Sequence, residues 1–308
     1  MKNILVQGAG AIGCYFAATM ALADYNVTLC VRDHQKAAYI REHGLALTDI
    51  RDGSTRRARV QVLECERIAE ARPDLALLSV KAFDTAAAAA QLAQVPGNFP
   101  VVSLQNGFGN REALLAHFPA ERIMLSIVYV GSRPAEEPGS MIWSGPGRVI
   151  FAPLTDDAMA VAEKVAATMS GAGLEAHPLK EAELSHILWE KLIVNSVVNT
   201  LASIYGVVNG KLPFIAEAAP KWNALIEEGV AVANAYGADL TCDYMQMRMR
   251  EVCRHSAGNR CSMLEDVLHG RRTEIDQING VICALGEQKG IPTPMQAEIR
   301  DIIKKLTE

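Results

Sequence analysis

The sequence predicts an α/β domain followed by an all-α domain. In its first half, short apolar runs alternate with helical stretches, a pattern typical of a parallel sheet that is covered on both faces. From residue 180 onward the strand signals disappear and the remaining segments are typical of helices. A chain of 308 residues is also longer than one ordinary core requires. We therefore expect two domains, residues 1–179 and 180–308.

The expected strands of the first domain are continuous apolar runs with helices between them. These strands are NILVQ (3–7), VTLCV (27–31), DLALLSV (74–80), VVSLQ (101–105) and IMLSIVYV (123–130), and the helices cover 11–23, 34–44, 82–94 and 110–118. Residues 131–152 are rich in Gly and Pro between short β runs, which predicts an antiparallel hairpin at a sheet edge. A helix near 156–170 and a short strand at 174–179 would complete the domain.

The second domain is expected to be helical throughout. Its predicted helices cover 181–204, 213–236, 241–256, 262–269 and 273–289. The motif GIPTP at 290–294 interrupts the helical pattern near the end of the chain.

Charge and cysteine content limit the class of protein. The net charge of −5 gives no general electrostatic reason to bind nucleic acid or an anionic membrane. We find no uninterrupted apolar run of membrane-spanning length, and the first apolar stretch is too short for a signal peptide. Seven scattered cysteines without a CxxC pair argue against a disulfide framework and a metal site, and for a reducing compartment. A cytoplasmic enzyme or binding protein is the expectation.

A glycine loop follows the first predicted strand. Gly8, Gly10 and Gly13 have G-x-G-x-x-G spacing, and a predicted helix comes directly after them. The first glycine permits a tight turn, the second lets a pyrophosphate approach the backbone, and the third lets helix and strand pack closely. The motif alone is weak evidence, but this context predicts a Rossmann-type doubly wound sheet that binds a dinucleotide. The expected contacts are Gly8, Ala9, Gly10, Ala11, Ile12 and Gly13.

The end of the second predicted strand bears on the choice of cofactor. Sites for NAD usually place a carboxylate there, whereas sites for NADP favour an arginine for the 2′-phosphate. Arg32 comes first and Asp33 next. Arg32 could be ordinary surface and Asp33 could serve NAD, but the order favours NADP (as NADPH).

Polar residues stand at the ends of two further predicted strands, where doubly wound sheets bind their ligands. Lys81 follows the strand at 74–80, and Asn106 follows the strand at 101–105. Lys81 could equally be a solvated lysine at a helix start, although a cation there opposes the helix dipole. Asn106 with Gly107 could equally be a turn.

One apolar helix carries a row of polar residues. Lys191, Asn195 and Asn199 are spaced by four, so at about 100° per residue they share an arc of roughly 80°. Asparagine costs helix propensity, and a solvated face would favour better helix formers. The row could be a polar seam between packed helices or the lining of a cleft that faces a polar ligand; the residues favour the cleft only slightly.

Two capping patterns occur further along. Thr273 and Asp276 have the spacing of a capping box, which would place Glu274 at the first helical position. Ser262 and Glu265 have the same spacing. Ser262 could therefore be only an N-cap, unless its hydroxyl or the nearby amides hold a substrate carboxylate.

Seven motifs together point to one family. They are GAGAIG (8–13), SVKAF (79–83), LQNGFG (104–109), WEKLIVN…N (189–199), CSMLED (261–266), TEIDQING (273–280) and GIPTP (290–294). The chain resembles the ketopantoate reductases (2-dehydropantoate 2-reductases), within the 6-phosphogluconate-dehydrogenase-like two-domain reductases. The resemblance covers essentially the full length, and K-x-x-x-N-x-x-x-N followed by TEID-x-x-NG is its most specific part.

The resemblance implies reduction of the C2 ketone of 2-dehydropantoate by NADPH, which gives (R)-pantoate for pantothenate and coenzyme A synthesis. Lys191 matches the lysine that acts as general acid toward the ketone oxygen, and Glu274 matches the carboxylate beside it. Asn195 and Asn199 match asparagines that face the substrate. Ser262 matches the contact to the substrate carboxylate.

The remaining matches are spread over both domains. Asn106, Lys81 and Arg32 match positions at the cofactor and at its junction with the substrate. Asn209 and Asn259 fall on polar positions on the substrate side. The partner implied is therefore a small-molecule 2-keto acid.

Two other functions stay open at this point. The wider family reduces other branched 2-keto acids, and Asp33 leaves room for NADH, so a related reductase is one alternative. A non-catalytic NADP-binding or sensing protein is another, but it would have no need for both Lys191 and Glu274. Apolar helical domains of this kind often pair, so a homodimer is an open alternative to a monomer.

Overall fold

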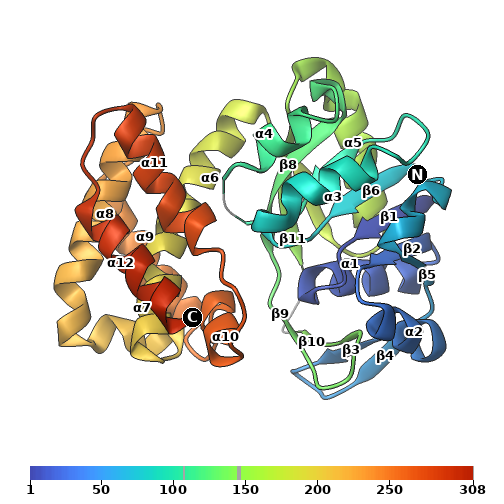
Figure 1. Cartoon of the computed structure of the whole chain (residues 1–308), viewed down its shortest axis with the longest axis horizontal. Coiled ribbons are helices and arrows are strands. Elements are labelled where there is room, and N and C mark those ends of the chain that lie inside the picture. Colours follow the sequence, from blue (N-terminus) through green and yellow to red (C-terminus); the bar gives the residue numbers. More distant parts are fainter. Residues whose placement is uncertain (107, 144–146, 308) are drawn as a thin grey trace. The chain divides into compact units, whose positions relative to one another are not determined.

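The computed structural model describes residues 1–106, 108–143 and 147–307. Their contacts divide the chain into two units. The first comprises Met1–Asn106 and Asn110–Leu184, and the second begins at Ser185 and also includes Phe108 and Gly109. Each unit is described by itself below (Figure 1).

A large, mainly parallel sheet forms the centre of the first unit. Its order is β12-β11-β8-β7-β6-β1-β2-β5. The strands are β1 (Asn3–Gln7), β2 (Asn26–Val31), β5 (Gln61–Glu64), β6 (Leu75–Leu78), β7 (Val101–Ser103), β8 (Ile123–Tyr129), β11 (Arg148–Pro153) and β12 (Glu175–Pro178). Only the pairing of β11 with β8 is antiparallel among the described strands of this sheet.

Helices cover both faces of this sheet, as continuous apolar strands predict. They are α1 (Ala11–Leu22), α2 (His34–His43), α3 (Thr85–Leu92), α4 (Asn110–Leu115) and α5 (Met159–Gly171). Side chains alternate along β1, so Ile4 and Val6 join the core under α1 while Leu5 joins the core under α3. Because β1 pairs in parallel with both β2 and β6, the carboxyl ends of the three strands share one edge, and predicted cofactor residues follow each of them.

A second, smaller sheet contains the hairpin predicted within 131–152. Its order is β4-β3-β10-β9, with β3 (Leu45–Asp49), β4 (Thr55–Ala58), β9 (Ser132–Pro134) and β10 (Ser140–Trp143). The antiparallel hairpin predicted within 131–152 exists as β9 and β10, but it belongs to this small sheet, while β11 joins the large one. Residues 144–146 of that stretch lie outside the described residues. The strands β3, β4 and β5 were not predicted, because short and partly charged segments such as TRRA lack an apolar run.

Helices are the only regular elements among the described residues of the second unit. After α6 (Glu181–Val194) come α7 (Thr200–Tyr205), α8 (Ala219–Ala235), α9 (Cys242–His255), α10 (Ser262–Leu268), α11 (Val281–Gln288) and α12 (Pro294–Leu306). Two π-helical turns were not predicted. Asn195–Asn199 lies between α6 and α7, and Asp276–Gly280 directly precedes α11. The predicted fold class, a doubly wound α/β domain followed by an all-α domain, is confirmed.

One helical stretch meets the size and hydropathy of a membrane span. It covers Glu181–Tyr205, and 67 % of its most apolar window is buried inside the protein. Core helices of globular proteins have this same combination of length, hydropathy and burial.

Candidate active site

The glycine loop between β1 and α1 is built as its spacing predicts. Gly8 has a φ of +111°, and its N–H donates to the Cys30 carbonyl at 3.2 Å. A Cβ on Gly13 would lie 1.9 Å from the Gly8 carbonyl oxygen, so only glycine fits where the helix packs on the loop. A Cβ on Gly10 would meet no described atom within 4 Å. The backbone at Gly10 thus faces open space, and no described side chain caps the N-terminus of α1.

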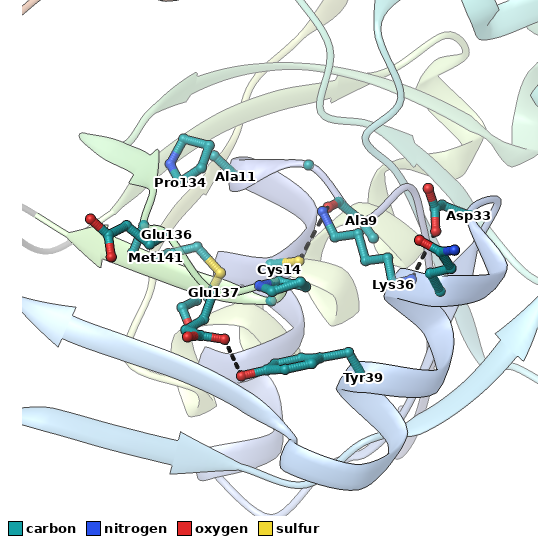
Figure 2. Close-up of a pocket in the computed structure, with 16 residues that line it drawn as sticks. Ala9, Ala11, Cys14, Asp33, Lys36, Tyr39, Pro134, Glu136, Glu137 and Met141 are labelled. Atoms are coloured by element: carbon teal, nitrogen blue, oxygen red, sulfur yellow. Dashed lines mark hydrogen bonds between the residues drawn. The ribbon is translucent and has the colours of Figure 1, made fainter.

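A cavity of about 560 Å³ lies beside this loop (Figure 2). The glycine loop and Cys14 of α1 line one part of it, and Asp33, residues of α2 and the segment 134–141 line the rest. The Lys36 ammonium donates to the Ala9 carbonyl at 2.6 Å and so fixes the loop from the side of α2. Further along α2, the Tyr39 hydroxyl donates to the Glu137 carboxylate of the segment 134–141.

Two of the side chains that hold the loop were missed by sequence reasoning. The Ser79 hydroxyl lies within 3.1 Å of the Gln7 carbonyl and 3.0 Å of the Gly8 carbonyl, and it can donate to either. Ser79 belongs to the SVKAF motif, so the motif contained a signal for it. Lys36 is the second missed side chain. A single lysine near the start of a helix gives no indication in the sequence that it contacts the glycine loop.

The residues after β2 have separate roles. The Arg32 side chain is 81 % exposed and forms an ion pair with Asp84 at 3.1 Å. One carboxylate oxygen of Asp33 accepts the Lys36 N–H at 2.8 Å and caps α2. A cap of this kind is worth about 1 kcal/mol. Asp33 therefore has a structural role of its own, whereas Arg32 extends into solvent.

A buried polar network supports the strand ends that carry Lys81 and Asn106. The Gln105 side-chain amide donates to the Thr85 hydroxyl at 2.6 Å and to the Val80 carbonyl at 3.0 Å. The Asn110 side-chain amide donates to the Asn106 carbonyl at 3.2 Å. Lys81 and Asn106 are themselves half-buried, with Lys81 at the start of a short 3-10 turn. Gly107, the second residue of the alternative turn, lies outside the described residues.

The polar row begins at the end of α6 and continues through the π-helical turn after it, and it is half-buried within an otherwise buried stretch. Lys191, Asn195 and Asn199 retain some exposed surface, while every other residue of 191–200 is buried. The π-helical turn Asn195–Asn199 tightens the row. Four residues exceed one α-helical turn but fall short of a π-helical one, so Asn199 swings back toward the line of Lys191.

The Lys191 ammonium lies in a strongly perturbed environment. Loss of hydration on burial lowers the pKa of Lys191 to about 8, and the Glu274 carboxylate opposes this by raising it. Glu274 is itself buried, at 8 % exposed. Although Lys191 keeps some accessible surface, it is thus deep enough to lose most of its hydration. A lysine with a pKa near neutrality beside a carboxylate is suited to proton transfer.

The capping box predicted from Thr273 and Asp276 is wrong. The π-helical turn Asp276–Gly280 follows Ile275, and no described side chain caps it. The Asp276 carboxylate instead pairs with the Lys304 ammonium at 2.7 Å, so it does not reach back along the chain. Glu274 consequently precedes the helix rather than occupying its first position.

A fully buried network joins the two π-helical turns. The Ser196 carbonyl accepts the Thr200 hydroxyl at 2.6 Å and the Asn279 side-chain amide at 3.1 Å. The same Asn279 amide donates to Gln296 at 2.9 Å, and Gln296 donates to the Leu225 carbonyl. The turn that carries Asn195 and Asn199 is therefore tied directly to the segment that follows Glu274.

Ser262 follows the residue that contacts the end of the polar row of Lys191, Asn195 and Asn199. It does not have the expected N-cap position. The N-cap of α10 is Cys261, whose sulfur accepts the Leu264 N–H at 3.4 Å. The Cys261 thiol also donates to the Asn199 carbonyl at 3.4 Å, which brings the start of α10 to the end of the polar row. Ser262 is exposed at the first turn. The N-cap explanation for Ser262 is therefore wrong.

Asn209 and Asn259 lie together elsewhere in the second unit. The Asn209 N–H donates to the Asn259 carbonyl at 3.0 Å. The Asn209 side-chain amide donates to the Ser256 hydroxyl at 2.9 Å, which ties it to the end of α9. Asn209 is buried and Asn259 is exposed.

Comparison with known proteins gives consistent similarities in sequence. Residues 4–156 match the family described as ketopantoate reductase PanE/ApbA, and residues 183–307 match its C-terminal domain. A 2-dehydropantoate 2-reductase of Pyrococcus abyssi is 30 % identical over 305 residues, which cover 98 % of this chain and 97 % of that protein. One of Halobacterium salinarum is 29 % identical over 302 residues, covering 98 % of each.

Solved structures resemble the chain over nearly its whole length. A D-mandelate dehydrogenase in complex with NADH and anilino(oxo)acetate has a TM-score of 0.92 at 25 % identity, covering 99 % of this chain and 98 % of that one. A PanE/ApbA family ketopantoate reductase from Ralstonia eutropha has a TM-score of 0.87 at 27 % identity, with the same coverage.

Proposed function

The chain belongs to the ketopantoate reductase family of oxidoreductases, and we propose that it reduces 2-dehydropantoate to (R)-pantoate with NADPH. The observation that carries this proposal is the pairing of Lys191, whose pKa is about 8, with the buried Glu274 beside it. Negative charge develops on the ketone oxygen as C2 is reduced. A positioned ammonium stabilises that charge and then protonates the oxygen.

Glu274 supports the same step. Burial alone would drive the Lys191 ammonium to lose its proton, and the neighbouring carboxylate counters that loss. Lys191 is therefore kept charged at neutral pH while its pKa stays low enough for efficient proton donation. We assign Lys191 as general acid and Glu274 as the residue that orients it and maintains its charge.

The amides and hydroxyl near Lys191 would bind the rest of the substrate. Asn195 and Asn199 share its half-buried row, and Ser262 follows the residue that contacts Asn199. Amides can select a substrate hydroxyl against analogues that lack it. We assign Ser262 to the substrate carboxylate, and Asn106, Asn209 and Asn259 to outer contacts.

We assign residues 1–179 to the dinucleotide, because several of their features fit one. Open space at Gly10 and the uncapped N-terminus of α1 suit a pyrophosphate, which the helix dipole favours. Arg32 is exposed where a 2′-phosphate would lie, and Lys81 and Asn106 follow neighbouring strands. When bound, NADPH supplies the hydride that reduces C2. Residues 180–308 are assigned to the substrate and the proton.

Substitution of the loop glycines tests the cofactor site. Gly10→Ala should leave the melting temperature nearly unchanged, because its Cβ meets no described atom, yet weaken NADPH binding by filling the pyrophosphate position. Gly13→Ala should lower the melting temperature, because its Cβ would lie 1.9 Å from the Gly8 carbonyl oxygen. Thermal melting and NADPH fluorescence titration measure the two effects. Unweakened binding in Gly10→Ala would contradict this placement of the cofactor.

Arg32→Ala tests the preference for NADPH. Loss of a charge-assisted contact to the 2′-phosphate should raise the KM for NADPH on the order of 10- to 100-fold. The KM for NADH, which lacks that phosphate, should change little. Arg57→Ala, an exposed arginine on β4, serves as the control. An equal effect on both cofactors would show that Arg32 does not read the phosphate.

A second candidate function has its own observation. The similarity to a D-mandelate dehydrogenase solved with NADH favours a related reductase of another branched 2-keto acid. Steady-state assays of a panel of 2-keto acids with NADPH and NADH separate the two functions. The highest kcat/KM with 2-dehydropantoate and NADPH supports the first, and a preference for another keto acid supports the second.

The proposed reaction belongs to pantothenate and coenzyme A synthesis, which we place in the cytoplasm. All seven cysteines, which lie within the described residues, are free thiols, as proteins of reducing compartments usually have. Whether the enzyme acts as a homodimer stays a prediction to be tested by its mass in solution.

A further inference from the structure

Two cysteines meet near the cofactor end of the large sheet. Cys30 lies in β2 and Cys65 follows β5, and their sulfur atoms are 2.9 Å apart. In the parallel pairing of β2 with β5, Cys30 is opposite Leu63, so Cys65 comes two residues later on the same face. A disulfide has an S–S bond of about 2.05 Å, so the two sulfurs need to approach by less than about 1 Å.

The two thiols differ in ways that suit stepwise oxidation. Cys65 is half-buried and reachable from solvent, whereas Cys30 is fully buried. The hydrogen bond with the Cys30 thiol lowers the pKa of Cys65, and the charge of Arg32 lowers it further, while burial and the charge of Glu66 oppose this without cancelling it. The same bond, together with burial, raises the pKa of Cys30. Cys65 is thus the better nucleophile of the pair.

The other cysteines do not share this environment. Burial raises the pKa of Cys14 and of Cys253 to about 11, and it also raises the pKa of Cys242, Cys261 and Cys283. All seven cysteines lie within the described residues, and Cys65 alone among them has a lowered pKa. Oxidation should therefore begin at Cys65.

We propose that Cys30 and Cys65 form a reversible disulfide whose formation weakens cofactor binding. The oxidant is a peroxide. The Cys65 thiolate attacks one oxygen of hydrogen peroxide, the O–O bond breaks, and the departing hydroxide takes up a proton as water. Cys30 then loses its proton and attacks the Cys65 sulfur, the S–O bond breaks, and a second water leaves. Two thiols lose two electrons in total, and the peroxide is reduced to two waters.

The link to the cofactor runs through β2. The Cys30 carbonyl accepts the Gly8 N–H of the glycine loop at 3.2 Å, and Arg32 is only two residues further along the chain. Movement of Cys30 toward Cys65 displaces the end of β2. It therefore also displaces the hydrogen bond to the Gly8 N–H and the side chain of Arg32. This effect rests on the proposed NADPH site, whereas the disulfide itself does not.

The test uses the full-length protein, treated with hydrogen peroxide and then alkylated. Mass spectrometry of unreduced peptides detects a link between Cys30 and Cys65, and NADPH fluorescence titration measures the Kd before and after treatment. We expect the linked peptide and a rise in Kd of about tenfold, as loss of one charge-assisted contact gives. Reduction with dithiothreitol should reverse both.

Three variants make the test specific. In Cys65→Ser and Cys30→Ala, peroxide should leave the Kd unchanged, whereas Cys242→Ser, which removes a half-buried thiol of the second unit, should respond like the parent protein. The proposal is overturned if the linked peptide does not form, if the Kd does not rise with it, or if Cys65→Ser responds equally. Failure of the untreated protein to bind NADPH or NADH would refute the proposed function and the effect on affinity, while the linked peptide would still decide whether the disulfide forms.

Discussion

Replacing Lys191 with alanine is expected to lower kcat/KM for the keto acid by about 100- to 10,000-fold, the usual contribution of a positioned general acid. The variant loses the ammonium that stabilises and then protonates the ketone oxygen. The fold should persist with a lower melting temperature, because the buried Glu274 carboxylate loses the positive charge near it. Steady-state kinetics with NADPH and 2-dehydropantoate measure the effect, and thermal melting checks the fold.

Two comparisons separate this role from a general loss of charge. Lys211→Ala removes an exposed lysine from the same unit and should leave kcat/KM unchanged. NADPH titration of Lys191→Ala should give the Kd of the parent protein, because the expected cofactor contacts lie in the first unit. Activity within about threefold of the parent would refute the role of Lys191 as general acid, since even a modest general acid contributes more.

The large sheet could be predicted because a strand that is buried on both faces is a continuous run of apolar residues. Strands such as β1 and β2 are continuous apolar runs, and the helices between them follow at short intervals. Of the small sheet, the sequence predicted only the hairpin of β9 and β10. β4 is mostly exposed and carries two arginines, and β3 pairs in parallel with β10, which is distant in the sequence. Pairing of this kind depends on tertiary contacts rather than on local pattern.

The candidate site was predictable to a similar degree. Spacing alone placed Lys191, Asn195 and Asn199 on one face, and the structure shows that row half-buried among buried neighbours. The π-helical turn within it could not be predicted, because its Ser196 carbonyl is satisfied by Asn279, more than eighty residues away in the sequence. The cap of α10 was misassigned for a related reason. Cysteine is a poor prior choice for an N-cap, yet here contacts with Asn199 hold Cys261 in place.

Glu274→Gln should move the pH dependence of ketone reduction. Lys191 must be protonated to act as an acid, so in the parent enzyme kcat/KM should fall as the pH rises through about 8. The Glu274 carboxylate raises the pKa of Lys191, and its replacement by a neutral amide of similar shape removes that contribution. The alkaline limb should therefore shift to lower pH. Above the shifted pKa, the fraction of Lys191 that is protonated falls about tenfold with each further pH unit.

Profiles of kcat/KM against pH for the parent and Glu274→Gln enzymes measure this shift directly. Asp276→Asn provides the matched control, because Asp276 is only two residues away but pairs with Lys304 at the surface, at 2.7 Å. Its alkaline limb should coincide with that of the parent. A purely structural role for Glu274 would lower kcat/KM equally at every pH and leave the limb in place. A limb that does not move would therefore exclude electrostatic support of Lys191 by Glu274, whatever the size of the loss in activity.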